Sequence, residues 1–359
     1  MGAAGAVEAV IADALAICAV AAPTFAEGER AALVAGRLRA QGAAPRIDAA
    51  GNVVARFGAA DGPAAIVAAH LDTVFAAGTP LRPHRDGGVL RGPGIGDDAL
   101  ALAALVHLAR RLAGAARAPA HPVVLAATVG EEGLGDLRGA RALLDAIECD
   151  AFVALEGHGL ESIQVAGIGS ARLIATVREP GGHSWSDRGA PSAVHTLVRA
   201  LHAGLRAAGR GHMNVGVIRG GTSVNTIAAE AEAEIDLRDG DDAVLDRRAA
   251  AVSRALAAAG ASVRQVGRRP AGRTPADHPL VAAARAARAA AGLPPADESA
   301  SSTDANAAMG RGIPAICVSL TDGAHSHRVD EHVELGPLAA GLAAVEQLVD
   351  ALAAGAAGA

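Results

Sequence analysis

Histidine and acidic side chains recur directly after short apolar runs of this 359-residue chain. His70 closes the run AAIVAAH, and Asp72 lies two residues further on, so its carboxylate can orient the imidazole from the same side of an extended backbone. Glu131 and Glu132 follow VVLAATVG, and Glu156 follows AFVAL. Such runs are typical of buried strands, and in open parallel sheets the carboxyl ends of the strands form the edge where ligands bind. The pattern predicts that these side chains meet there.

Two further segments carry candidates of the same kind. GPGIGDD ends in Asp97 and Asp98, and the run IPAICVSL leads into TDGAHSHRVDE, which holds His325 and His327. Imidazole with carboxylate is a zinc-type ligand set, and two histidines with at least three acids are enough for two metal ions. Adjacent carboxylates raise each other's pKa unless a cation lies nearby. The residue types therefore indicate a metal-dependent site.

Each motif alone has a simpler interpretation. His70 could be a surface histidine beside a turn, Glu131 and Glu132 an exposed loop pair, and Asp97 or Asp98 the cap of the helix that follows. A dinucleotide-binding oxidoreductase has little support, because the glycines form GxGxG rather than GxGxxG and no strand leads into them. A serine nucleophile is also disfavoured, because the chain has no GxSxG elbow.

The elements that must position these residues alternate between short strands and Ala-rich helices. This alternation predicts an α/β domain with a mixed, largely parallel sheet flanked by helices. The expected strands cover residues 64–69, 123–128, 151–155 and 315–320, and the expected helices cover 29–40, 99–112, 280–291 and 336–354.

The middle of the chain has a different pattern. Residues 171–178 and 225–238 alternate apolar and polar side chains, which is typical of strands with one solvated face. Helices are expected at 192–208 and 242–259, and a last strand at 262–266. We therefore expect an inserted α+β domain at 170–275, between the two parts of the α/β domain at 1–169 and 276–359.

Composition narrows the class of protein. The net charge of −6, without an Arg-rich run, argues against binding to nucleic acid. The apolar stretch 14–26 is too short to span a bilayer, so no membrane association is expected. Three cysteines without a CxxC motif fit a reducing cytoplasm and argue against a disulfide framework.

Taken together and in order, the motifs resemble a family of di-zinc amidohydrolases. That family includes aminoacylase, acetylornithine deacetylase, succinyl-diaminopimelate desuccinylase, glutamate carboxypeptidase and tripeptide aminopeptidase. The resemblance covers nearly the whole chain and rests on HLDTV, GPGIGDD, TVGEEGLGDLRGAR, EGHG, GGHSWSDRGAPSAVH and SHRVDEHVEL. It implies a catalytic α/β domain with an inserted α+β lid, and a homodimer formed through the lid.

The resemblance also implies roles for single residues. Its implied ligands of two Zn²⁺ per chain, with Co²⁺ or Mn²⁺ as alternatives, are His70 and Glu156 on the first ion, Glu132 and His327 on the second, and Asp97 as the bridge. Asp72 would orient His70, Glu131 would be the general base, and the bond between the two aspartates is often cis in this family. His325 is the rival of His327. Ala99 departs from the family, which often has Lys there, but that Lys is not a ligand.

Three residues of the inserted domain complete the comparison. His183 resembles the lid histidine that stabilises an oxyanion, often from the partner subunit. Asn225 and Arg238 resemble the residues that hold a substrate's free carboxylate, although Arg238 could be an ordinary surface arginine. Trp185 could line the pocket or pack within the lid.

The expected function is hydrolysis of an amide bond in a small N-acyl amino acid or short peptide. Glu156, where other members have Asp, favours deacylases and carboxypeptidases, which cut beside a free carboxylate. The alternative within the family is an aminopeptidase or dipeptidase. A non-catalytic metal-binding homologue is the third hypothesis, and the presence of Glu131, which no metal needs as a ligand, argues against it.

Overall fold

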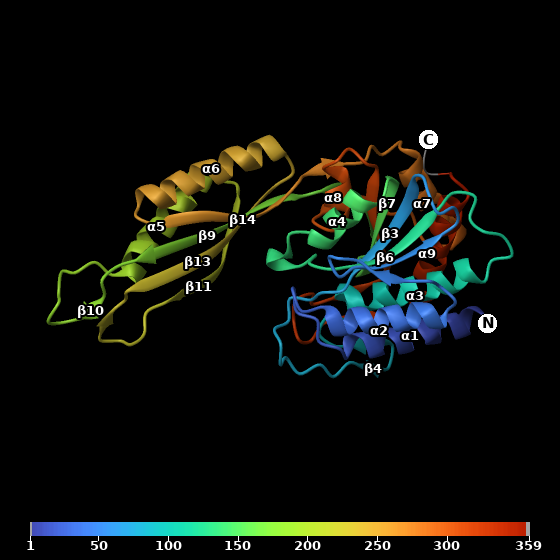
Figure 1. Ribbon diagram of the computed structural model, residues 1–359, viewed down its shortest axis with the longest axis horizontal. Helices are drawn as coiled ribbons and strands as arrows, with labels where there is room; N and C mark the ends of the chain where they lie inside the picture. The colour runs from blue at the N-terminus through green and yellow to red at the C-terminus, as the bar shows by residue number, and fades with distance from the viewer. Residues whose placement is uncertain (1, 357–359) are drawn as a thin grey trace. The chain divides into compact units, whose positions relative to one another are not determined.

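The computed structural model describes residues 2–356, and the chain divides into two compact units. Unit 1 comprises the residues up to 167 and those from 273 onward, whereas unit 2 comprises 168–272. These boundaries lie within three residues of those expected from the sequence. Unit 2 is coloured from green to orange in Figure 1, because its residues lie between the two parts of unit 1 in the sequence.

Unit 1 is built on a nine-stranded sheet, whose order is β1-β2-β6-β3-β7-β17-β8-β15 with β16 paired to β8. Its strands are β1 (Arg46–Ile47), β2 (Val53–Phe57), β3 (Ala64–His70), β6 (Val123–Thr128), β7 (Cys149–His158), β8 (Ser162–Gly167), β15 (Gly272–Arg273), β16 (Asp297–Ser301) and β17 (Ala315–Thr321). The four central strands β6, β3, β7 and β17 are parallel to their neighbours among them. Antiparallel β2 and β8 flank them, so the sheet is mixed as expected.

Helices cover both faces of this sheet (Figure 1). They are α1 (Ala3–Cys18), α2 (Gly28–Ala40), α3 (Leu100–Ala113), α4 (Arg138–Ala146), α7 (Pro279–Ala290), α8 (Ala305–Met309) and α9 (Leu338–Ala353), with the short turns η1 (Ile95–Ala99) and η2 (Gly133–Gly135). A second, four-stranded sheet consists of β4 (His84–Asp86), β5 (Val89–Arg91), β18 (Gly323–Ala324) and β19 (His332–Glu334).

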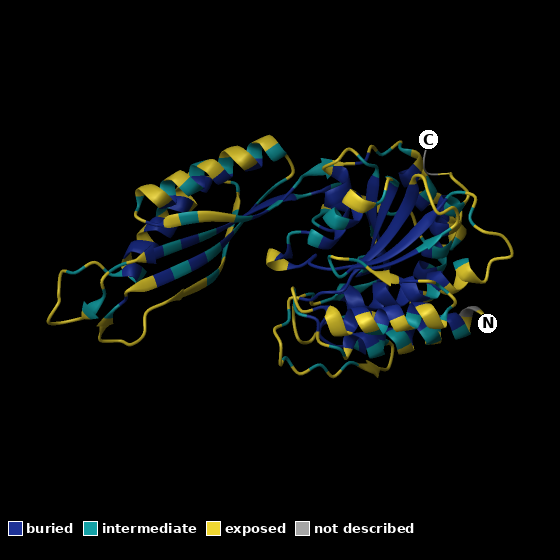
Figure 2. Ribbon diagram, viewed as in Figure 1, coloured by how far each residue is buried: buried dark blue, intermediate teal, exposed yellow. Residues whose placement is uncertain are grey.

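The burial of β3 on both faces explains why its sequence is apolar until its last residue. All seven of its residues are buried, which Figure 2 shows as dark blue central strands. Successive side chains point to opposite faces of a strand. Ala65 and Val67 join the core formed with α1, α2, α3, α7 and α9, whereas Ile66 and Ala68 join the core formed with α4 and α8. A strand covered on both faces has no polar position until it ends.

Unit 2 has one layer of helices on one sheet. The sheet order is β11-β13-β9-β14, and a two-stranded ribbon joins β10 and β12. The elements are β9 (Gly169–Arg178), β10 (Gly182–His183), α5 (Ala193–Ala208), β11 (His212–Gly220), β12 (Thr226–Ile227), β13 (Glu230–Asp239), α6 (Asp242–Ala258) and β14 (Ser262–Arg269). Alternate residues of β9 and β13 pack with α5 and α6 in a separate core, and the opposite face is more exposed (Figure 2). The expected α+β architecture is confirmed.

One expected strand of unit 2 is interrupted. The sequence predicts a continuous strand over 225–238, but the structure separates β12 from β13 at Ala228 and Ala229. Their carbonyl groups accept hydrogen bonds from the N–H groups of Ala193 and Glu179, so neither continues the ribbon. In the sequence, an apolar residue occupies every second position from Ile227 through Ala229 to Leu237, which is why the pattern does not reveal the bend.

Close packing between β7 and η1 explains a glycine of the EGHG motif. A Cβ atom added to Gly157 would lie 2.8 Å from the Cα of Gly96, which is backbone and cannot turn away. The glycine therefore lets η1 approach the sheet, and η1 carries Asp97 and Asp98.

We expect Gly157→Ala to destabilise the metal-free protein by about 1–3 kcal/mol, because the methyl group forces η1 off the sheet. Gly36→Ala is the matched control: Gly36 is an exposed residue within α2 whose added Cβ meets no atom within 4 Å. That change should stabilise the protein by about 0.5–1 kcal/mol. Urea unfolding of both variants measures the difference. Equal effects would show that η1 does not depend on this contact.

Candidate metal centre

The ends of the central strands bring the acidic and histidine side chains together. His70 is the last residue of β3 and is in register with Thr128, the last residue of β6. Glu156 lies near the end of β7, opposite Ser319 of β17. All four strands end at the same edge of the sheet because they are parallel. This arrangement gathers His70, Asp97, Asp98, Glu132, Glu156 and His327, which we call the metal cluster.

Asp97 lies at the centre of the metal cluster. One of its carboxylate oxygens is 2.9 Å from Nε2 of His70, and the other is 3.1 Å from Nε2 of His327. The same His327 nitrogen lies 3.3 Å from a carboxylate oxygen of Glu132. Potential ligand atoms of His70, Asp97 and Glu132 all lie within 4.8 Å of one another. A carboxylate with one oxygen toward each histidine suits a position between two metal ions.

Asp98 and Glu156 form the other side of the metal cluster, and their ligand atoms also lie within 4.8 Å of His70. Asp98 is fully buried, and one of its oxygens accepts a hydrogen bond from the His70 backbone N–H at 3.0 Å. Its other oxygen is buried without a hydrogen-bond partner. The peptide bond between Asp97 and Asp98 is cis.

The cluster contains more negative charge than its own histidines balance. Burial, reinforced by the charge of Asp97, raises the pKa of Glu132 to about 7. Burial and the charge of Asp98 hold the pKa of Glu156 well above its usual range. Hydrogen bonds to Asp97 and Glu132 raise the pKa of His327 to about 10. Carboxylates buried this closely, one of them with an orphaned oxygen, fit a divalent cation as their counter-charge.

Asp72 positions the cluster in a way that differs from the expected one. Nδ1 of His70 lies 2.9 Å from the backbone oxygen of Asp72, whereas the nearer carboxylate oxygen is 3.8 Å away. The fully buried carboxylate instead accepts hydrogen bonds from the backbone N–H groups of Glu131 and Glu132, both at 2.9 Å, and from the Thr24 hydroxyl at 2.8 Å. Those three donors occupy the carboxylate, so the carbonyl group orients the imidazole.

The structure decides between the alternatives that the motifs left open. Glu131 and Glu132 are buried, with exposed fractions of 6% and 7%, so they are not an exposed loop pair. Neither Asp97 nor Asp98 caps α3, because the N-cap position is Ala99 and no side chain caps the helix. His325 lies off the cluster, where its Nδ1 is 3.0 Å from Asp330.

Three supporting residues were not anticipated. Glu331 accepts hydrogen bonds from the backbone N–H groups of Gly94, Gly96 and Asp97 at 2.7–2.9 Å, which fixes the loop that presents Asp97. Thr24 contacts Asp72, as described above. Asp304 accepts a 2.5 Å hydrogen bond from Thr128 at the end of β6, and burial raises its pKa to about 7. Of these three residues, only Glu331 has a signal in the sequence, which is its position four residues after His327.

The candidate residues of unit 2 lie at its two opposite ends. His183 and Asn225 are exposed and adjacent, because β10 and β12 pair His183 with Thr226. Arg238 pairs with Ser170 at the other end of β9, where the chain enters the unit. Its guanidinium lies 2.7 Å from the Asp236 carboxylate. From register position 170 to 178 the sheet extends about 26 Å, at about 3.3 Å per residue, and the β10–β12 ribbon lies beyond that point.

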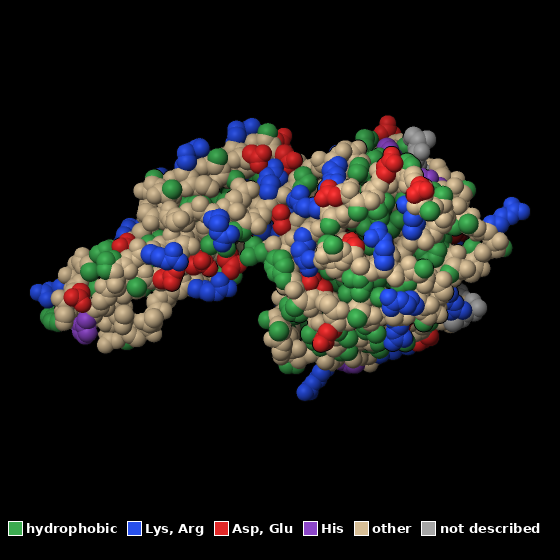
Figure 3. Space-filling model, in the orientation of Figure 1, with side chains coloured by type: hydrophobic (Ala, Val, Ile, Leu, Met, Phe, Trp, Pro, Cys, Tyr) green, Lys and Arg blue, Asp and Glu red, His purple; other side chains and the backbone are tan. Residues whose placement is uncertain are grey.

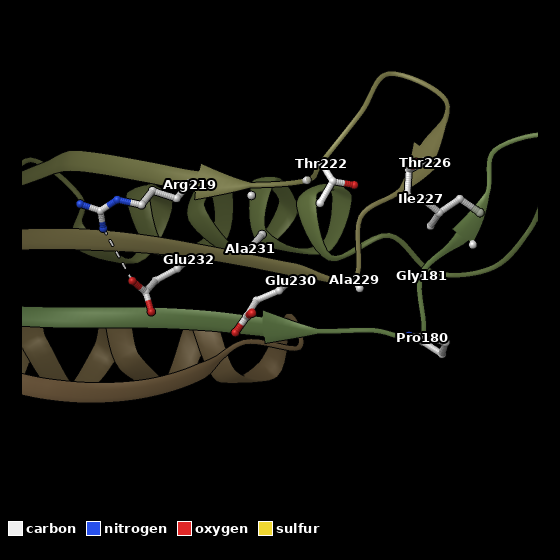
Figure 4. A pocket seen from close by; sticks show the side chains of 13 residues that line it. Pro180, Gly181, Arg219, Thr222, Thr226, Ile227, Ala229, Glu230, Ala231 and Glu232 are labelled. Atoms are coloured by element: carbon white, nitrogen blue, oxygen red, sulfur yellow. Dashed lines mark ion pairs between the residues drawn. The ribbon is translucent and has the colours of Figure 1, made fainter.

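A hollow of unit 2 lies beside the β10–β12 ribbon that carries His183. It has a volume of about 690 Å³ and is lined by glycines of the turns after β9 and β11, by Thr222 and Thr226, and by Arg219 and Glu232 (Figure 4). Arg219 is engaged by Glu234 at 2.7 Å. Among the described residues, the groups of side chains that could hold a metal ion belong to unit 1 and not to the lining of this hollow.

Three further features concern the surface and the chain as a whole. Arginine and acidic side chains are interspersed on the face shown in Figure 3. All three cysteines are unpaired. Across residues 2–356, every helix is too short or too polar to cross a membrane.

Comparison with known proteins places this architecture. No curated protein sequence matches the chain. Aminopeptidase PepT from Bacillus cereus ATCC 10987 superposes with a TM-score of 0.72 at 22% identity, over 97% of this chain and 99% of that one. The dipeptidase Dug1p from Saccharomyces cerevisiae gives 0.76 at 12%, over 98% of both chains, and human carnosine dipeptidase 1 gives 0.75 at 12%, over 97% of both. These likenesses show the shared fold.

A family model establishes the relationship that the motifs suggested. The model of peptidase family M20/M25/M40 matches residues 66–351, a span that contains the whole metal cluster and all of unit 2. The match confirms the resemblance seen in the sequence. The chain therefore belongs to peptidase family M20/M25/M40, whose members are metal-dependent enzymes that hydrolyse amide bonds in peptides.

Proposed function

We propose that the protein uses two zinc ions to cleave an amide bond beside a free carboxylate, in small N-acyl amino acids or short peptides. The convergence of the metal cluster on Asp97, next to the buried Glu131, carries this proposal. His70, Asp97 and Glu156 would hold one ion, and Asp97, Glu132 and His327 the other. Nitrogen and oxygen donors of this kind suit Zn²⁺, with Co²⁺ or Mn²⁺ as alternatives.

A bound metal would supply Lewis acidity and lower the pKa of a bound water to about 7. Glu131 accepts the proton of the attacking water and passes it to the leaving nitrogen, which prevents expulsion of an unstable amide anion. The backbone N–H groups of Glu131 and Glu132 both donate to the Asp72 carboxylate, which fixes the backbone that carries the two side chains. His183 donates a hydrogen bond to the carbonyl oxygen as negative charge develops there.

Metal binding is the first test. Dialysis against zinc should load two ions per chain and raise the melting temperature, because a ligand at 1,000 times its Kd stabilises the folded state by about 4 kcal/mol. His327→Ala should lose one ion, whereas His325→Ala, off the cluster, should keep both. Elemental analysis of the three proteins gives the counts. Absence of metal uptake would refute the metal centre, and one ion in the wild type would refute its second half.

Replacing each of the two adjacent glutamates by glutamine should remove a different property of the enzyme. Glu131→Gln should keep both metal ions and lose activity by about 10²–10⁴-fold, because only proton transfer is removed. Glu132→Gln should lose activity and weaken metal binding, because a charged ligand is replaced by a neutral one. Activity and metal content measured on the same preparations separate the two roles. If the variants exchange behaviours, the base and the ligand are assigned the wrong way round.

The second candidate function is an aminopeptidase or dipeptidase. The fold neighbours named above are an aminopeptidase and two dipeptidases, and this favours peptide substrates with a free amino group. Comparing hydrolysis of an N-acetyl amino acid with that of an unblocked tripeptide separates the candidates. Faster hydrolysis of the tripeptide would replace the deacylase assignment by the peptidase one. For the compartment we propose the cytoplasm, which the three unpaired cysteines support.

The positions of the residues in unit 2 favour a homodimer formed through the lid. His183 and Asn225 lie at one end of the unit and Arg238 at the other, about 26 Å of strand apart. A substrate of one or two amino acids is too short to reach both ends. If all three residues bind one substrate, Arg238 belongs to one chain and His183 with Asn225 to its partner.

Mixing two inactive variants tests this arrangement. His183→Ala should lower kcat by about 10²–10³-fold without changing metal content, because one oxyanion donor is lost. In a mixed dimer of His183→Ala and Glu131→Gln chains, one site would carry both lesions and the other neither. With random exchange of subunits, activity should return to about a quarter of the wild-type value. No recovery after confirmed exchange would exclude a contribution across the dimer.

A further inference from the structure

Most of the exposed large hydrophobic side chains of unit 1 lie close in sequence to residues of the metal cluster or to the residues that support it. Among the described residues of unit 1 there are five such side chains, and they are Phe25, Ile47, Val74, Leu134 and Val329. Val74 lies two residues after Asp72, Leu134 two after Glu132, and Val329 two after His327. Only Ile47 lies elsewhere, on β1, two strands beyond β6 at the edge of the sheet.

Phe25 belongs to the same rim through its neighbour. The Thr24 hydroxyl donates to the Asp72 carboxylate at 2.8 Å and lies 3.5 Å from the backbone oxygen of Glu132. Phe25 therefore stands beside the loops that carry the cluster. Its ring lies over the Arg138 guanidinium, 5.6 Å from the ring centroid, and remains 64% exposed.

The backbone of Phe25 is strained in a way that keeps this ring in place. Its φ of 76° lies in the left-handed region, which aromatic residues rarely adopt. The surrounding turn holds it there, since the Phe25 N–H donates to Glu27 at 3.1 Å and the Ala26 N–H donates to Pro23 at 2.8 Å. Strain of this kind persists where the surroundings over-determine it, and it is concentrated at ligand sites.

Charged groups on the rim already have partners of their own. Arg138 donates to both carboxylate oxygens of Glu27 at 2.8 Å. Arg328, beside Val329, forms a two-fold contact with Asp330 at 2.8 and 2.9 Å. These ion pairs balance the charge of the rim, so its exposed hydrophobic side chains add apolar surface that no unpaired charge of Arg138 or Arg328 disturbs.

We propose that Phe25, Val74, Leu134 and Val329 form a specificity surface that selects substrates with an apolar group next to the scissile amide. The inference rests on the proposed function, because it assigns a side-chain preference to that same reaction. Covering apolar rim surface with an apolar group removes both from water, whereas a polar group of the same size loses hydrogen bonds to water instead. The contact forms before the chemical step and persists through it, so it acts on KM rather than on kcat.

Matched substrates and matched variants test this surface with the zinc-loaded enzyme. The probes are two pairs, N-acetyl-leucine with N-acetyl-glutamine and Leu-Gly-Gly with Gln-Gly-Gly, in which leucine and glutamine have similar size. The pairs place the side chain on opposite sides of the cleaved bond. In at least one pair, kcat/KM of the wild type should favour leucine by about tenfold or more, the lower range for one hydrophobic contact in a pocket.

Phe25→Asn and Leu134→Gln should each reduce that preference by about 3–10-fold through a higher KM for the leucine probe. Asn accepts a positive φ, so the first variant removes the ring without adding backbone strain. Turnover of the glutamine probe and the metal content should stay unchanged. Ile47→Gln is the control, because it removes from β1 a hydrophobic side chain whose exposure of 49% lies between those of Leu134 and Phe25, and it should leave all four probes unaffected.

Two results would overturn the specificity surface while leaving the proposed function intact. One is equal hydrolysis of leucine and glutamine probes by the wild type. The other is an equal loss on both members of a pair in the rim variants, which would indicate a structural or lid contact instead. If a metal-loaded enzyme hydrolyses none of the probes, the proposed function itself fails and the specificity assignment falls with it.

Discussion

The repulsion among buried carboxylates is the constraint on which the rest of unit 1 depends. Asp97, Asp98, Glu132 and Glu156 lie around only two imidazoles, and one oxygen of Asp98 has no hydrogen-bond partner. In a low dielectric such a group is costly unless a cation joins it. Binding of a cation would therefore stabilise the metal cluster. Without the cation, the surrounding residues must hold its side chains in place.

The surroundings hold it mainly with backbone donors. The Asp72 carboxylate takes the N–H groups of Glu131 and Glu132, and the Glu331 carboxylate takes three N–H groups of the loop before and including Asp97. Neither acid needs to touch a metal to matter. Each of these acids fixes the loop that carries one candidate ligand. Fixing the position of a ligand in this way tunes the affinity of a site for its metal and the chemistry of that metal.

The burial of strands and the hydrogen bonds to backbone groups differ in how far the sequence predicts them. Strand ends, and with them His70, Glu131 and Glu156, follow from apolar runs, because a strand covered on both faces allows a polar residue only where it stops. The order of the motifs then identified the family. The role of Glu331 depends on contacts with residues about 235 positions away, and the carbonyl that orients His70 belongs to the backbone, which has no residue-type signal. The separation of Arg238 from His183 depends on strand register, which alternation alone leaves open.

Strained backbone conformations are found in unit 1 and not in unit 2, among the described residues. Among the described residues, the non-glycine residues with positive φ are Phe25, Asp136, Leu137, His325 and His327. All five lie in unit 1, and His325 and His327 belong to the loop that carries a candidate ligand of the metal cluster, whereas unit 2 has regular strands and helices throughout its core. Residues in this region of φ persist only where neighbouring contacts over-determine them. His327 is one of the five, and its imidazole contacts Asp97, so a strained backbone position coincides with a candidate ligand of the metal cluster.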